Sequence, residues 1–122
     1  MEPGNTAYEL HTDPGALDRE AGHLAGQAPS YGNLTSIGLH SLPGGRLDFK
    51  TRLNDRSLWN AGGGLYAHKH AVGNAAWGNY MARGGYGLGT ALRGAAGQGV
   101  TRGGKDPFDQ LMITRGYNLW PR

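Results

Sequence analysis

Glycine is the residue that most constrains what this chain can fold into, because 23 of its 122 residues are Gly, against an average near 7%. Glycine buries no side chain, and inside a helix each one costs about 1 kcal/mol relative to Ala. The apolar residues are nevertheless clustered at helical spacing. We therefore predict one compact, glycine-rich domain that is mainly α-helical with a small β element (α+β class).

Charge divides the chain into two parts. Residues 1–44 hold five acidic side chains and one basic side chain, whereas residues 45–122 hold eleven basic and four acidic ones. We predict an acidic N-terminal segment or linker with one helix over residues 1–44, followed by a basic core over residues 45–122. A basic core suits a polyanion such as RNA, DNA or an anionic glycan, or an acidic protein, and it also favours solubility.

Several classes of site are missing from the sequence. The chain has no Cys, which excludes disulfides and thiolate metal ligands. It has no apolar run near the ~20 residues of a membrane span, no signal-peptide pattern, and neither a Gly-x-Ser-x-Gly nor a His-Glu-x-x-His motif. We predict no metal and no cofactor, which leaves catalysis by His, Asp and Lys, or no catalysis, and we expect any export to depend on another part of the protein.

Hydrophobic spacing and end signals place the secondary structure. Asp-Pro pairs precede two of the apolar patterns and are typical of helix starts, and glycines within the patterns indicate close approach of a neighbouring backbone. Leu47 and Phe49 alternate with polar residues, which is typical of a short strand. We predict helices over 13–25, 65–83, 88–96 and 106–116, a strand over 46–51, and a loop over 30–45.

Asp48 and Lys50 form the first candidate site. On a strand their side chains share one face, so a carboxylate and an ammonium group can converge on one phosphate or one metal-bound water. Many metal-dependent nucleases use an acid-x-Lys strand, but the second acid of such a site has no nearby candidate beyond Asp13. An exposed ion pair is the alternative interpretation.

His68 and His70 form the second candidate site. Two residues apart on a helix they point about 200° away from each other, so they share a ligand only where the backbone is extended. His70 aligns with Tyr66, Asn74 and Trp77 on one helix face. A neutral His suits the activation of an RNA 2′-hydroxyl, although a His in such a place is more often structural.

The helix predicted from residue 106 contributes three polar candidates. Asp106 is expected to cap the helix, and Asp109 is an acid in its first turn, where the helix dipole favours it. Arg115 either binds phosphate or satisfies carbonyl groups at the helix end. Gly116 is expected to terminate the helix.

Three stretches in order resemble the bacterial polymorphic toxin type 44 family. Residues 44–50 resemble its Leu-Asp-hydrophobic-Lys signature, and residues 73–78 its Gly-Asn-x-x-aromatic-Gly signature, with Trp77 where Tyr is usual. Residues 106–109, followed by 113–117, resemble its Asp-Pro-x-Asp and Ile-x-x-Gly segments. The likeness covers residues 44–117 and depends on the order and spacing of the motifs.

The resemblance implies an antibacterial toxin domain at the end of a larger secreted protein, delivered into a target bacterial cell and neutralised by a cognate immunity protein. It makes Asp48, Lys50, Asn74 and Asp109 the motif positions, and residues 45–122 the toxin core. The resemblance does not indicate which reaction the domain catalyses.

The first hypothesis is a ribonuclease-like hydrolase that acts in the target cytoplasm. The +7 core, the available His and Lys, and the absence of thiols favour RNA as the target. Lys50 and Arg115 would hold phosphate, His70 would be the base or acid, and Asp48 would orient it. Asn74 and Trp77 would contact the substrate.

Two alternatives stay open. A periplasmic peptidoglycan-cleaving toxin would need a pair of carboxyl groups, and Asp48 with Asp109 is the pair available in the core. A non-catalytic, membrane-perturbing toxin is the second alternative, and the mean hydropathy of −0.53 argues against it.

Overall fold

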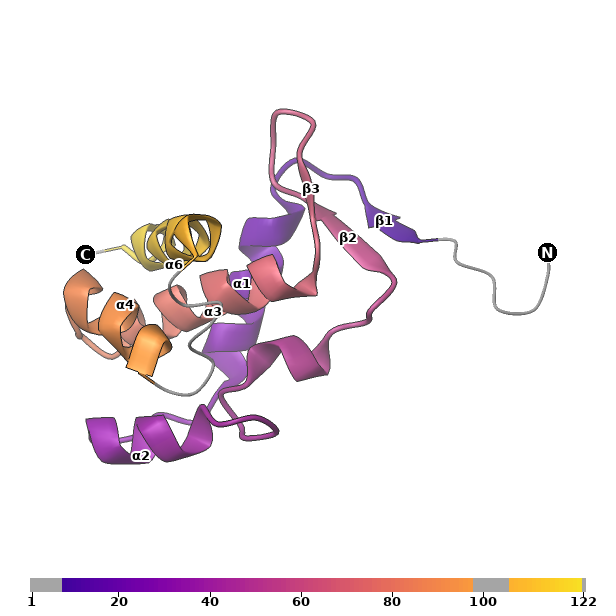
Figure 1. The fold of residues 1–122 in the computed structure, drawn as a ribbon. Helices are drawn as coiled ribbons and strands as arrows, with labels where there is room; N and C mark the ends of the chain where they lie inside the picture. The colour runs from indigo at the N-terminus through magenta and orange to yellow at the C-terminus, as the bar shows by residue number, and fades with distance from the viewer. Residues whose placement is uncertain (1–7, 98–105, 122) are drawn as a thin grey trace.

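The computed structural model describes residues 8–97 and 106–121, and their fold confirms the α+β class (Figure 1). Five α-helices lie beside a three-stranded sheet in this part of the chain. The elements are β1 (Glu9–His11), α1 (Ala16–Gln27), α2 (Leu34–His40), the 3₁₀ helix η1 (Phe49–Arg52), β2 (Ser57–Asn60), β3 (Tyr66–Ala67), α3 (Lys69–Arg83), α4 (Leu88–Gly97) and α6 (Pro107–Leu119).

The sheet is small and mixed. Its order is β1-β2-β3, with β1 parallel to β2 and β2 antiparallel to β3. His11 is opposite Trp59 in the first pair, and Trp59 is opposite Ala67 in the second. Because β3 leads directly into α3, the sheet sets where that helix begins.

Helix α3 lies at the centre of the domain, between α1 and α6, with η1 and α4 also packed on it (Figure 1). Most of its residues are buried, and many are Ala or Gly, so that neighbouring helices approach closely. The predicted helix 65–83 is therefore present, but it begins at Lys69, because residues 66 and 67 pair with β2 as strand β3. None of the described helices is long and apolar enough to span a bilayer.

Two glycines bring α3 and α6 into backbone contact, which was expected for Gly78 but not for Gly116. A Cβ on Gly78 would lie 1.9 Å from the carbonyl oxygen of Ile113, and a Cβ on Gly116 would lie 1.8 Å from that of Ala75. The prediction that Gly116 ends the helix is wrong, since α6 continues to Leu119. Gly116 is required by this contact with α3 rather than by a turn.

Two sequence predictions in the middle of the chain are also wrong. The loop expected over residues 30–45 contains α2, whose start is capped by Asn33: its side chain accepts a hydrogen bond from the Ser36 amide at 2.8 Å. The strand expected over residues 46–51 is absent, and Phe49 begins η1 instead. Leu47 and Phe49 are nevertheless buried, as the alternating pattern predicted.

The described part of the acidic N-terminal segment packs on the rest of the domain. Leu17, Ala21 and Leu24 of α1 are buried against the core, and β1 pairs with β2. The segment carries two helices, α1 and α2, where one was expected. The expected helix starts at residues 88 and 106 are confirmed, with the Asp106 side chain accepting from the Phe108 amide at 2.7 Å.

Candidate functional site

The acid-x-Lys pair forms at the start of η1. Asp48 is buried, with its side chain only 4% exposed, and its Oδ1 accepts a hydrogen bond from Lys50 Nζ at 2.9 Å. Its Oδ2 accepts from the Gly44 amide at 2.8 Å. Asp48 therefore uses both oxygens to hold Lys50 and the preceding turn, while the Lys50 side chain remains one third exposed. The two side chains converge through a tight helical turn, where the sequence predicted a strand.

Lys50 lies directly against α3. A Cβ on Gly73 would approach the Lys50 Cβ to 3.2 Å, so glycine at position 73 lets η1 pack at this point. On α3, His70 precedes Gly73 by three residues and Asn74 is the residue directly after Gly73. The ammonium group of Lys50 is close enough to His70 to lower the pKa of its imidazole. The first two motifs of the sequence therefore meet at this turn of α3.

Helix α6 contributes a carboxylate to the same region. Asn74 Nδ2 donates a hydrogen bond to Asp109 Oδ1 at 3.0 Å. Partial burial raises the pKa of Asp109, the negative charge of Asp106 raises it further, and His70 opposes both effects. Asp48, Lys50, His70, Asn74 and Asp109 thus form one group of side chains from three elements, which we call the five-residue cluster.

His70 is the exposed base of the five-residue cluster. Partial burial is the largest cause that lowers its pKa, followed by the positive charges of Lys50, His68 and Lys69, whereas Asp109 raises it. His70 therefore stays neutral at a lower pH than an ordinary His near 6.5. A neutral, solvent-accessible imidazole beside an ammonium group can accept a proton from a substrate bound to that ammonium group.

His68 is placed differently from the expected helical arrangement. It precedes α3 in extended backbone, and its Nε2 lies 3.0 Å from the carbonyl oxygen of Asp55. Lys69 forms an ion pair with the Asp55 carboxylate. The rings of His68 and His70 stack with their centroids 5.8 Å apart, so they do not point away from each other. Over residues 8–97 and 106–121, no three His, Asp or Glu side chains are grouped to hold a metal ion.

Two of the seven predicted site residues serve the fold. Trp77 is buried, and its indole nitrogen donates to the Ala91 carbonyl at 2.9 Å, which fixes α4 against α3. Arg115 forms an ion pair with Asp18 at 2.7 Å and also donates to the Ala61 carbonyl. Trp77 is therefore only 7% exposed and Arg115 is paired within the fold, and the roles of these two residues in substrate binding stay predictions.

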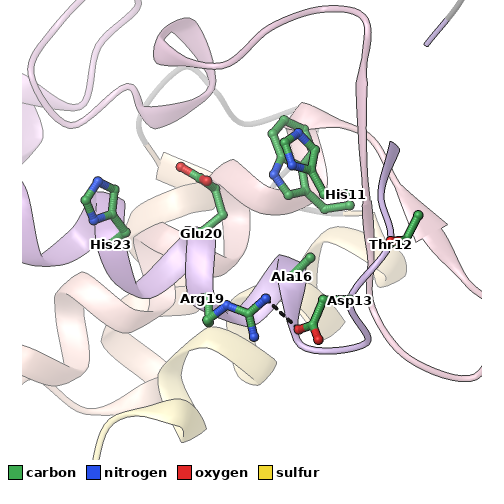
Figure 2. A pocket seen from close by; sticks show the side chains of 8 residues that line it. His11, Thr12, Asp13, Ala16, Arg19, Glu20 and His23 are labelled. Atoms are coloured by element: carbon green, nitrogen blue, oxygen red, sulfur yellow. Dashed lines mark ion pairs between the residues drawn. The ribbon is translucent and has the colours of Figure 1, made fainter. Parts of the chain in front are cut away.

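The sequence analysis missed a second polar region, a groove of about 690 Å³ between α1 and the β1–β2 pair. His11, Arg19, Glu20, His23 and Trp59 line it, and Figure 2 shows the first four as labelled side chains. The signal was available in the helix pattern, because Arg19, Glu20 and His23 recur at helical spacing on the face of α1 that also carries Ala16.

No protein family model, no curated protein and no solved structure matches this chain. The resemblance to the polymorphic toxin type 44 family therefore rests on the three motifs alone.

Electrostatic coupling within the five-residue cluster gives a direct test of its geometry. Replacing Lys50 with Met removes a positive charge, so we expect the pKa of His70 to rise. Replacing Asp109 with Asn removes the negative charge that favours the imidazolium, so we expect that pKa to fall. NMR titration of the His70 ring protons measures both shifts, with His40 as the internal reference. Shifts of the same sign, or none, would contradict this arrangement.

Proposed function

We propose that this chain is the C-terminal toxin domain of a polymorphic toxin and that it cleaves RNA in the cytoplasm of a target bacterium until a cognate immunity protein blocks it. The observation that carries the proposal is the five-residue cluster. Four of its members, Asp48, Lys50, Asn74 and Asp109, are the motif positions of the resemblance, and they come from η1, α3 and α6.

The chemistry that suits these groups is attack by a ribose 2′-hydroxyl on the adjacent phosphate. His70, neutral because of its lowered pKa, takes the proton from the 2′-hydroxyl. The 2′-oxygen then bonds to phosphorus, the bond from phosphorus to the 5′-oxygen breaks, and the departing 5′-oxygen takes a proton from water. The products are a 2′,3′-cyclic phosphate and a 5′-hydroxyl, so the reaction needs no external oxidant, reductant or nucleophile.

The remaining members of the cluster support this step. Lys50 binds the phosphate oxygens, where negative charge increases in the transition state, and Asp48 holds Lys50 in place. Asp109 favours the protonated form of His70, so it stabilises the imidazolium formed by proton transfer. Asn74 keeps the Asp109 carboxylate in position. Asp48 is thus a positioning residue for Lys50, not for His70 as the sequence suggested.

The surroundings of the cluster favour a nucleic acid over a glycan. Arg46, Arg52 and Arg56 are exposed in the segment that contains η1, and such side chains bind a phosphate backbone. Glycan cleavage needs two carboxyl groups free to act as acid and as base or nucleophile. Both oxygens of Asp48 are already bound, to Lys50 and to Gly44, so within the five-residue cluster Asp109 has no free carboxylate beside it for that chemistry.

A paired toxicity assay tests the proposal. The domain is expressed in bacteria once in the cytoplasm and once behind an export signal, and viable cells are counted. We expect killing from the cytoplasm, accompanied by loss of intact cellular RNA, and no killing by the His70→Ala protein. Killing that requires export would overturn the RNA proposal and favour a cell-wall target.

A further inference from the structure

The groove between α1 and the β1–β2 pair contains polar groups that have no partner among the described residues. Arg19 is satisfied by an ion pair with Asp13 (Figure 2). Among the described residues, neither the Glu20 carboxylate nor the His23 imidazole has a hydrogen bond or ion pair. The indole nitrogen of Trp59 is buried and also unpartnered within that part of the chain. Glu20 is half-buried and His23 is exposed, so both side chains can meet a ligand from solvent, whereas a buried polar atom without a partner, such as the Trp59 nitrogen, is uncommon in a folded interior.

The groove also offers a flat surface. The His11 ring stacks on the Trp59 indole, with centroids 5.0 Å apart and planes within 2°. Trp59 is buried beneath it, whereas the His11 side chain is 36% exposed. In Figure 2, the labelled His23, Glu20 and His11 follow one another across the view. A planar ligand that stacks on the exposed His11 ring would therefore lie in the groove that Glu20 also lines.

We propose that this groove binds an unpaired guanine base of the RNA substrate, with His11 as the stacking surface and Glu20 as the residue that reads the base. Single-stranded bases are commonly held by stacking on aromatic or His rings and by hydrogen bonds to their Watson–Crick edges. This inference rests on the proposed function, because it names the base that the ribonuclease would select.

Guanine is the base whose edge matches a carboxylate. Its N1–H and N2–H donors lie side by side, so both can donate to the two oxygens of Glu20. Adenine and cytosine place an acceptor nitrogen next to their amino group, and uracil places carbonyl oxygens on both sides of its single N–H. Each of these three would bring an acceptor against the negative charge of Glu20, and such a mismatch discriminates strongly.

The small sheet connects the groove to the five-residue cluster. Trp59 is opposite Ala67 in the β2–β3 pair, and Ala67 precedes His70 by three residues. A base held on the His11–Trp59 stack is therefore attached to the same structural unit that carries the proposed base of the reaction.

Isothermal titration calorimetry with guanosine, adenosine, cytidine and uridine 5′-monophosphates tests the inference. We expect the guanosine nucleotide to bind at least tenfold more tightly than the other three, and Glu20→Gln to remove at least tenfold of that affinity. Asp106→Asn is the matched control, because it makes the same charge change outside the groove and Asn also caps helices. Circular dichroism verifies that each variant is folded.

Equal affinity for the four nucleotides, or unchanged guanosine affinity in Glu20→Gln, would overturn the guanine assignment. The His70→Ala protein separates this result from the proposed function, since it should lose RNA cleavage and keep guanosine binding. Wild-type cleavage without base preference would remove the guanine site and leave the ribonuclease. Guanosine binding without any cleavage by the wild-type protein would remove the ribonuclease proposal and leave the guanine site.

Discussion

Gly116→Ala is expected to destabilise the folded domain by about 3 kcal/mol or more, since one added methyl group must displace a backbone. The new Cβ would lie 1.8 Å from the Ala75 carbonyl oxygen and 2.7 Å from the Ala75 Cα. A flexible side chain could move away, but these atoms belong to the central helix. In an exposed helix the same substitution stabilises the folded state by about 1 kcal/mol. The sign of the change in unfolding free energy therefore shows whether Gly116 is in close contact with α3. Urea denaturation followed by circular dichroism measures the change.

Gly22→Ala is the control for that experiment. Gly22 lies inside α1, and a Cβ there would meet only the end of the Arg83 side chain, at 4.0 Å. We expect this variant to gain up to about 1 kcal/mol from helix propensity. If both substitutions changed stability in the same direction, the close contact between α3 and α6 would be wrong.

His70→Ala is expected to lower RNA cleavage by about 10²–10⁴-fold, the range typical for removal of a general base. His70 is exposed and no described hydrogen bond of the fold uses it, so the variant should keep its stability. Cleavage is measured with a fluorescently labelled oligoribonucleotide across a pH series. Because the pKa of His70 is lowered, wild-type activity should persist below pH 6.5 and fall only once the imidazole is protonated.

Two controls accompany the His70 experiment. His40→Asn alters a His that stacks on Tyr31 outside the five-residue cluster, and Arg93→Ala removes an exposed positive charge of α4. Both should retain cleavage close to wild type. Full cleavage by His70→Ala would eliminate it as the base, whatever the controls show.

The sequence predicted those elements whose signals are local. Asp106 and Pro107 mark the start of α6, and hydrophobic spacing located α1 and α4. Helix α2 was not predicted, because it has seven residues and buries only Ile37. One buried residue is too few to produce a periodic hydrophobic pattern. Asp48 and Lys50 were correctly paired for a wrong reason, since a 3₁₀ turn brings them together where a strand was expected.

The roles of individual site residues depended on contacts far apart in the chain. Arg115 is occupied by Asp18, a partner 97 positions away that no local pattern indicates. Trp77 occupies the aromatic position of its motif. Whether its side chain faces solvent or the interior depends on where α4 packs. Asn74 and Asp109, 35 positions apart, were suggested by their motifs, and only the contact of α3 with α6 explains why they meet.

The glycine contact between α3 and α6 also has a consequence for the order in which the protein is made. A ribosome releases α3 well before α6, so a partly synthesised chain has its central helix without the backbone that fits against Gly78. Until α6 emerges, the chain lacks Asp109 and the core side chains Met112, Ile113 and Tyr117. The contact between α3 and α6, and with it the hydrogen bond from Asn74 to Asp109, therefore forms only after this late helix has been synthesised and has docked.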